Sequence, residues 1–585
     1  MRKCTSLITG LIVFLTGQFA TAQQGNSFRE VLRSLSDDPA LESLVPPETG
    51  TIKCGTPYRL AIHSRWNSLT PQSRARLMQV MQRPTLQTSK LSPSGRFRVH
   101  FDTTNINFNQ PALIAAGQDV PNSYNAYIDS VMAILDHVWT YEIDTLGYGP
   151  PLHDGSEGGG PEYDVYVQEL GTYLFGYTDW DPNDPASIVN GGNRRYPTYM
   201  VIDNDFLGMR TPGMDGLKVT CAHEFHHAIQ IGSYGMWTEN DFYFNELTSS
   251  WMEDVVYTQV NDYYYDVERY FSTPNAQPGV PSGFRDTQGY PLSFTYYNPS
   301  TYGGYERSIF GHFLAKRYGR DMMKEIWQGI SIEPFLLSAR DAFARRASNW
   351  NTEFALFTYW NYFTGDRADT VRFYSEGNHY PRFDPNITAD FSSNTNTCSI
   401  SSGGYPLSSG MYEFHLLRQQ DTVTAIAANV ELDAALAGDN AVRQLQLELT
   451  KGVLSIPHVT LANGYNAGIA NTDPNKWRIF YTLSSTRSDI VKLNLQASPN
   501  PLRLSDASQL LLPLNGASAT KANVYFLSSS LTLQYSAQFD VENQFGNQYI
   551  AVPTSQLRSR LTSGIYFVVA KIADGEFTWK IAVIR

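Results

Sequence analysis

The segment 221–230, CAHEFHHAIQ, constrains the fold more than any other part of the chain. It places His223 and His227 four residues apart, with Glu224 directly after the first histidine. Residues four apart share one face of an α-helix, so both imidazoles can reach one metal ion if this segment is helical. Glu224 then lies beside the metal, where its carboxylate can accept the proton of an attacking water. We therefore predict a helix at about 215–231 with two metal ligands and a general base.

The residues around this helix predict an α+β unit. Alternating apolar residues predict strands at 96–104, 163–170 and 196–203, and apolar residues at helical spacing predict a helix at 124–143. After about Asp390, short alternating stretches replace the helical patterns and predict β-sandwich domains. We expect five parts: a signal peptide at 1–22, a polar, helix-prone and propeptide-like segment at 23–95, an α+β domain at 96–390, and β-sandwiches at 391–496 and 497–585.

A metal site on this helix needs a third ligand, and the sequence offers two candidates. Glu246 lies nineteen residues after His227, and Glu253 lies seven residues further on. Both belong to a segment with a helical pattern, and two helical turns place them on the same face. The spacing by itself leaves both glutamates open as the ligand.

The pair Asn245-Glu246, nineteen residues after the second histidine, resembles the gluzincin metallopeptidases, the superfamily of thermolysin and aminopeptidase N. Over roughly 96–390 the chain is similar to secreted bacterial metalloproteases of this superfamily. The resemblance implies a zincin-like catalytic domain that binds Zn²⁺ through His223, His227 and Glu246 and acts on a protein or peptide. It also implies that Glu253 orients a ligand histidine.

The same resemblance suggests a donor for the oxyanion. Aminopeptidase N relatives use a tyrosine at the start of a helix, and Tyr305-Glu306-Arg307-Ser308 is similar to that helix start. Tyr305 is therefore a candidate catalytic residue, with packing as the alternative role and Tyr302 as the reserve candidate.

Two departures from the family restrict the expected activity. The Gly-x-Met-Glu-Asn segment with which aminopeptidases hold a substrate N-terminus does not precede the motif, and the similar GMWTEN at 235–240 follows it. Ser250 stands where thermolysin relatives usually have aspartate. We therefore expect an endopeptidase that binds an extended chain along an edge strand.

Several further residues have two interpretations. His226 could be a ligand only by displacing the general base, and Cys221 fits a buried core position. For Cys54 we favour a disulfide with Cys398; the alternative is latency, because KCGTP resembles the cysteine switch of matrix metalloproteases.

A second metal is one interpretation of the acidic loop DWDPND. Asp179, Asp181 and Asn183 offer oxygen ligands for Ca²⁺ at alternate positions. Because Asp184 stands where an EF-hand loop has glycine, a solvated acidic turn is the favoured alternative.

The ends of the chain predict export. Arg2 and Lys3 precede the apolar run 7–19 and the small residues 20–22, a pattern typical of a signal peptide and too short for a transmembrane anchor. The last unit resembles the sorting domains of the bacterial type IX secretion machinery, through Pro499-Asn500-Pro501, Ser563-Gly564-Ile565-Tyr566, Lys580 and Arg585; an immunoglobulin-like accessory domain is the alternative. We expect a secreted or cell-surface protein.

The composition removes one class of partner. The formal net charge is −12, and no cluster of Lys and Arg offers a nucleic-acid surface. The sequence therefore favours a secreted zinc endopeptidase. Two alternatives remain: an exported binding or adhesion protein whose metallopeptidase-like domain is inactive, and a β-sandwich carbohydrate-binding protein in which the motif is accidental.

Overall fold

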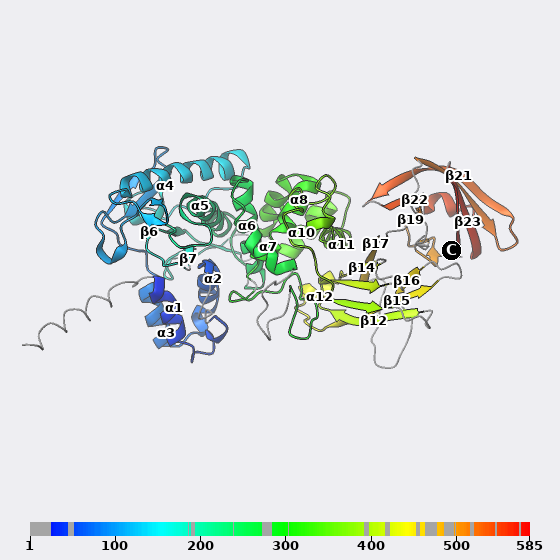
Figure 1. Cartoon of the computed structure of the whole chain (residues 1–585), viewed down its shortest axis with the longest axis horizontal. Helices are drawn as coiled ribbons and strands as arrows, with labels where there is room; N and C mark the ends of the chain where they lie inside the picture. The colour runs from blue at the N-terminus through cyan, green and yellow to red at the C-terminus, as the bar shows by residue number, and fades with distance from the viewer. Residues whose placement is uncertain are drawn as a thin grey trace, which may run out of the picture.

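The computed structural model shows a mixed α/β region, a helical middle and a strand-rich C-terminal part (Figure 1). The described residues are 25–44, 52–172, 174–184, 186–188, 193–237, 239–271, 283–301, 303–390, 397–415, 422–451, 457–461, 477–484, 497, 499–514, 520–544, 547–572 and 575–585. The predicted signal peptide and Tyr302 lie outside them. Among the described helices, none is long and apolar enough to cross a membrane.

A six-stranded sheet is the framework of the α/β region. Its order is β1-β7-β10-β6-β3-β2, with bounds Ile52–Cys54, Leu174–Asp179, Tyr199–Asp203, Tyr163–Gln168, Phe97–Phe101 and Thr88–Leu91. Every residue of β6, β7 and β10 is buried. Strands buried on both faces need a covering layer on each side, and this sheet has two separate apolar clusters in contact with it.

Three helices build one side of this region: α4 (Tyr124–Trp139), α5 (Gly213–Ile229) and α6 (Phe242–Val256). The predicted helices at 124–143 and 215–231 are therefore present as α4 and α5. Helix α5 lies against β7 and β10 on one side and against α6 on the other. All residues of α6 are buried, so any polar side chain it carries must find its partners inside the protein.

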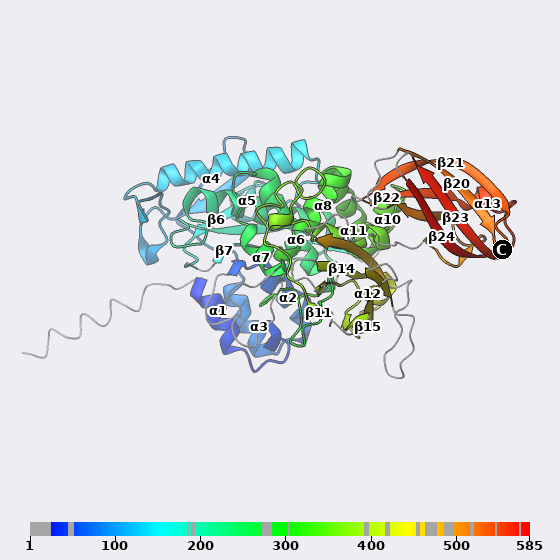
Figure 2. The same cartoon turned by 45° about the vertical axis from the view of Figure 1, so that its right-hand side comes forward.

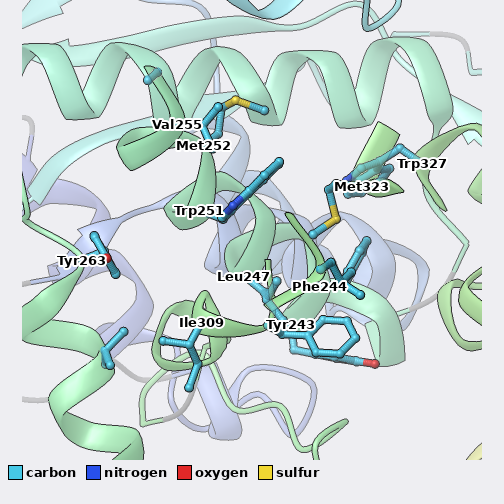
Figure 3. Close-up of a cluster of buried hydrophobic side chains, with 14 of the residues drawn as sticks. Tyr243, Phe244, Leu247, Trp251, Met252, Val255, Tyr263, Ile309, Met323 and Trp327 are labelled. Carbon is cyan, nitrogen blue, oxygen red and sulfur yellow. The ribbon is translucent and has the colours of Figure 1, made fainter. Parts of the chain in front are cut away.

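The helical middle packs around α6. Its helices are α7 (Tyr264–Phe271), α8 (Ile309–Tyr318), α9 (Asp321–Ile330), α10 (Phe335–Ala344) and α11 (Trp350–Trp360). Figure 3 shows Tyr243, Phe244, Leu247 and Trp251 of α6 among side chains from these neighbours. Helix α6 is thus packed between α5 on one side and the helical middle on the other.

Gly311 lies where α8 packs against α6. A Cβ at this position would lie 2.4 Å from Cγ of Trp251, whose side chain is fully buried. Alanine gains about 1 kcal/mol of helix propensity over glycine, but overpacking a core costs about 1–3 kcal/mol. We expect Gly311→Ala to lower the free energy of unfolding by up to about 2 kcal/mol in urea titrations, because the buried indole of Trp251 has to shift.

Gln328, exposed on α9, provides the control for this substitution. Gln328→Ala should change the free energy of unfolding by less than about 0.5 kcal/mol. A more stable Gly311→Ala protein would show that α6 and α8 can separate at no cost.

The propeptide-like part predicted at 23–95 is the leading segment of the chain. Its described helices form a small lobe beneath the sheet (Figure 2). Its helices α1 (Gly25–Ser34), α2 (Thr56–Arg65) and α3 (Pro71–Val80) share an apolar core of their own. The same segment also contributes to the sheet: β1 pairs with β7 at one edge, and β2 pairs with β3 at the opposite edge. The predicted boundary at residue 95 therefore falls inside a β-hairpin, between β2 and β3.

The C-terminal part is rich in strands, as predicted. One four-stranded sheet has the order β11-β13-β14-β17 (Ile387–Asp390, Ser409–His415, Thr422–Asn429, Trp477–Ser484), and a three-stranded sheet has the order β12-β15-β16 (Thr397–Gly404, Arg443–Lys451, Pro457–Leu461). The last unit is a seven-stranded sheet that curls around its own core, close to a barrel. Its order is β18-β24-β23-β20-β21-β22-β19 (Leu502–Arg503, Gly575–Ile584, Gly564–Ile572, Lys521–Ser528, Leu533–Gln544, Asn547–Pro553, Gln509–Leu514).

Candidate metal centre

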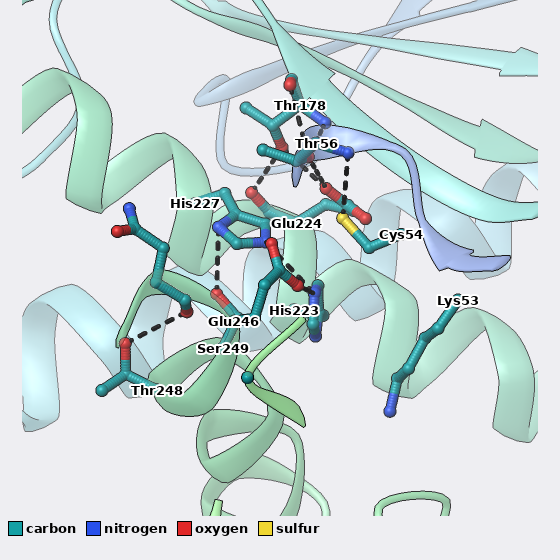
Figure 4. Close-up of polar contacts among 12 residues, drawn as sticks. Lys53, Cys54, Thr56, Thr178, His223, Glu224, His227, Glu246, Thr248 and Ser249 are labelled. Atoms are coloured by element: carbon teal, nitrogen blue, oxygen red, sulfur yellow. Dashed lines mark hydrogen bonds and ion pairs between the residues drawn. The ribbon is translucent and has the colours of Figure 1, made fainter. Parts of the chain in front are cut away.

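Helices α5 and α6 bring two imidazoles and a carboxylate to one point. The Nε2 atoms of His223 and His227 lie 3.1 Å apart. Glu246 of α6 lies against both, with its Oε2 at 3.2 Å from His223 Nε2 and its Oε1 at 3.0 Å from His227 Nε2. Figure 4 shows the three side chains converging from the two helices. The structure therefore assembles a candidate metal site from residues that the sequence spacing selected.

Hydrogen bonds on the far side of each imidazole determine which nitrogen faces this point. Glu253 Oε1 lies 2.6 Å from Nδ1 of His223, and a carboxylate can only accept, so this Nδ1 carries a proton. Gln230 Oε1 lies 2.8 Å from Nδ1 of His227, and the amide group of Gln230 donates to Asn245 and Thr248 instead. With both Nδ1 atoms protonated, the two Nε2 atoms face each other and Glu246, at a position that either a proton or a metal ion can occupy.

Cys54 adds a thiol to this group. One ligand atom from each of Cys54, His223, His227 and Glu246 lies within 4.8 Å of the others, and all four residues are buried. Cys54 reaches the site from β1, far from the two helices in sequence. The described part of the chain thus contains a candidate metal site with four potential ligands.

The close contacts of these residues shift their pKa values in opposite directions. Burial opposes a charge on His223, but the hydrogen bonds to Glu246 and Glu253 raise the pKa of its imidazole to about 10. Burial likewise opposes the charge on Glu246, but His227 and His223 lower the pKa of this carboxyl to about 2. Glu246 is therefore ionised at neutral pH, and a proton and a metal ion compete for the same position.

Glu224 points its carboxylate toward Cys54 and the sheet. Its Oε2 accepts hydrogen bonds from the hydroxyls of Thr178, at 2.9 Å, and Thr56, at 3.2 Å. Its Oε1 is buried and has no hydrogen-bond partner among the described residues. An unpartnered buried oxygen beside a metal site indicates where a further polar group can be held.

Tyr305 lies next to the site, in a short 3₁₀ helix at Tyr305–Arg307. Its ring stacks on His223 with centroids 5.9 Å apart. Burial, followed by the charge of Glu246, raises the pKa of Tyr305 well above its usual range. The phenol therefore keeps its proton, which it shares in a hydrogen bond with the carboxylate of Glu246.

Glu253 is a link between the site and the leading segment. Its Oε2 accepts from the buried Nζ of Lys53 at 2.7 Å, while its Oε1 contacts His223. Lys53 Nζ also lies 2.6 Å from Asp262 Oδ2, and the three nearby carboxylates raise the pKa of its ammonium despite burial. Glu253 thus carries its charge on the Nδ1 side of His223, away from the Nε2 atoms.

Sequence reasoning missed several residues of this site. They are Lys53 and Thr56 of the leading segment, Thr178 of β7, Gln230 after α5 and Ser249 of α6, which lies 3.2 Å from His227 Nδ1. Gln230 follows His227 by three residues, a spacing that places it on the ligand face of the helix. Lys53 and Thr56 belong to the segment KCGTP around Cys54, and Ser249 follows Glu246 by three residues on α6, whereas no sequence signal points to Thr178.

The structure corrects the favoured interpretation of Cys54. Cys54, Cys221 and Cys398 are all free thiols, so the predicted disulfide between Cys54 and Cys398 is wrong. Cys54 faces the imidazoles, whereas Cys398 lies on β12, in a different sheet. Cys221 packs in the apolar core and is not part of the metal site.

His226 points away from the metal site. Its Nδ1 lies 2.7 Å from Oε2 of Glu142, in the turn that follows α4. Burial raises the pKa of Glu142 and lowers the pKa of His226, so both groups are neutral.

The carboxylate oxygens of the acidic loop form ion pairs and hydrogen bonds with other protein groups. Asp179 pairs with Arg59 at 2.5 Å and His63 at 2.7 Å, and Asp181 Oδ1 accepts from the backbone N–H of Asn183. We do not propose calcium at this loop.

Comparison with known proteins found no matching family model and no matching curated protein.

Proposed function

We propose that this chain is a zinc-dependent endopeptidase of the gluzincin type. One observation carries the proposal: the Nε2 atoms of two imidazoles and an ionised carboxylate converge on one point, beside a second carboxylate that has an unpartnered oxygen. The first three groups can hold the metal, and Glu224 can act on the substrate side. This combination is the minimum that metal-assisted hydrolysis requires.

The donor set supports zinc as the metal. Imidazole nitrogen, carboxylate oxygen and thiolate sulfur are the ligands that Zn²⁺ takes in proteins, commonly in a tetrahedral arrangement. Bound zinc would act as a Lewis acid toward the peptide carbonyl and lower the pKa of a water to about 7. A catalytic site of this kind holds zinc through three protein groups, here His223, His227 and Glu246, and leaves one position open.

The protein groups would then share the remaining steps. Glu224 accepts a proton from the attacking water and passes it to the departing amine, while the hydroxyl of Thr178 keeps its carboxylate in place. Tyr305, protonated at neutral pH, donates a hydrogen bond to the oxygen that gains negative charge. Glu253 holds the ring of His223 through Nδ1.

The four-ligand arrangement also favours a second candidate function. A zinc ion held by His223, His227, Glu246 and Cys54 has no open position, and closed sites of this kind usually stabilise structure. In that case the chain is an exported binding protein with an inactive metallopeptidase-like domain. The buried carboxylate of Glu224 favours the peptidase, because a structural site needs no additional base.

Zinc content and cleavage of an unfolded protein distinguish the two functions. We expect about one zinc per chain. After the backbone has been cleaved between the leading segment and the rest of the chain, we expect hydrolysis of unfolded casein. Dialysis against a chelator should remove both the zinc and the hydrolysis. Readdition of zinc should restore hydrolysis. A protein that holds one zinc and yet cleaves no substrate, before or after this cut, would support the structural role.

We also propose that the protein is exported to the cell surface or beyond. The basic and apolar N-terminus supports a signal peptide, and the motifs near Pro499 and Ser563 support recognition by a type IX secretion machinery. Protein or peptide is the proposed substrate.

A further inference from the structure

We propose that residues 25–81 keep the enzyme latent by occupying its metal, its general base and its substrate-binding strand at the same time. This inference rests on the proposed peptidase function and assigns a regulation to that same site. Three sets of contacts carry it, and each joins the leading segment to a different part of the site.

The first contact places a thiol at the metal position. Cys54 lies within 4.8 Å of the ligand atoms of His223, His227 and Glu246 and is fully buried. As a thiolate it completes four protein ligands, which removes the open position that a catalytic zinc site needs. The side chain of Glu224 lies beside this thiol, so Cys54 also occupies the space next to the proposed base.

In the second contact, the leading segment pairs with strand β7 at one edge of the sheet. Strand β1 pairs in parallel with β7, in the register Ile52–Leu174 and Cys54–Gly176, and the N–H of Gly55 donates to the carbonyl of Gly176 at 2.9 Å. β7 would otherwise present a free edge beside α5. An extended peptide that binds by adding a strand needs this edge, so β1 excludes it.

The third contact restrains the charged groups. The hydroxyl of Thr56 donates to Oε2 of Glu224 at 3.2 Å, and Lys53 contacts Glu253 at 2.7 Å. Arg59 of α2 pairs with Asp179 at the end of β7. In sequence, Cys54 thus lies between Lys53, which contacts Glu253, and Thr56, which contacts the proposed base Glu224. Figure 4 shows Lys53, Cys54 and Thr56 around the site.

The chain also has a place where the lobe can be separated from the sheet. Residues 82–87 connect α3 to β2 without helix or strand, and Gln82, Thr85 and Gln87 in this connection are exposed. The strands β1 and β2 lie at opposite edges of the sheet, so a cut in 82–87 leaves β2 paired with β3 and frees the lobe from β7. The lobe has its own apolar core, which it can keep after release.

Cobalt substitution of the full chain tests the contact of Cys54 with the metal. A thiolate bound to Co²⁺ gives a charge-transfer band in the near ultraviolet, and we expect this band in the wild type. Cys54→Ala should lose the band while still holding one cobalt per chain. Cys221→Ala removes another buried thiol and should keep it, and Cys54→Ser serves as the isosteric variant if the alanine variant does not fold.

Hydrolysis of unfolded casein by the zinc-loaded protein tests latency. A tethered ligand acts at millimolar effective concentration, so cutting the wild type within 82–87 should raise hydrolysis at least about tenfold. The cobalt band should disappear at the same time. We also expect the intact Cys54→Ala chain to be more active than the intact Cys221→Ala chain.

The outcomes separate this inference from the proposed function. An intact wild type as active as the cut chain would overturn latency and leave the peptidase function standing. A fully cobalt-loaded wild type without the band would overturn the contact of Cys54 with the metal. A cut chain that holds one zinc and cleaves nothing would overturn the peptidase function, and latency with it.

Discussion

Glu224→Gln should leave one zinc per chain and reduce peptide hydrolysis by about 100- to 10,000-fold, the range for loss of a general base. The amide keeps the shape of the side chain, and its oxygen can still accept from Thr178 of β7. It cannot take a proton from water. The comparison is made on chains cut within 82–87, with zinc content measured on the same samples.

Glu142 offers a matched control for this substitution. It is also a fully buried glutamate near α5, but it contacts His226 and not a metal ligand, and burial keeps it neutral. Glu142→Gln should therefore keep both zinc and activity. Activity at the wild-type level in Glu224→Gln would exclude Glu224 as the base.

Zinc stoichiometry should distinguish the role of Glu246 as a metal ligand from the supporting role of Glu253. Both oxygens of Glu246 face the Nε2 atoms of the two histidines, at 3.2 and 3.0 Å. Glu246→Ala removes a ligand and a negative charge from the metal position, so we expect a protein without stoichiometric zinc after dialysis. Added zinc should not restore activity at micromolar concentration.

Glu253→Ala should have a weaker effect, because Glu253 contacts only the Nδ1 side of His223. We expect zinc affinity or activity to fall by about 10- to 100-fold, measured by competition with a chromogenic chelator. Glu253→Gln keeps an acceptor for Nδ1 and should recover part of this loss. Full zinc occupancy in Glu246→Ala together with loss of zinc in Glu253→Ala would reverse the two assignments.

Local patterns predicted the elements that carry the site. The helix expected at 215–231 is observed at Gly213–Ile229, and the helix expected at 124–143 begins at Tyr124 and ends in the turn at Thr140–Thr145. The first prediction follows from the spacing of the two histidines, and the second succeeds because apolar residues at helical spacing need a buried face, whatever the rest of the fold. The spacing of His223 and His227 is a property of the same helix.

Strand β1 was not predicted because it has only three residues, Ile52–Cys54. Such a segment has no measurable periodicity and is a strand only because β7 presents an unpaired edge to it. The disulfide prediction failed for a related reason. A count of cysteines contains no information on distance, and packing places Cys54 beside the imidazoles and Cys398 in another sheet.

By itself, the sequence determined the chemistry that this helix offers: two imidazoles on one face, with a carboxylate beside them. The tertiary structure decided which groups meet that face. The contact of Lys53 with Glu253 spans 200 residues, and the contact of Thr56 with Glu224 spans 168 residues. No periodic pattern encodes contacts of this kind, because they depend on how the sheet, α5, α6 and the leading lobe exclude water together.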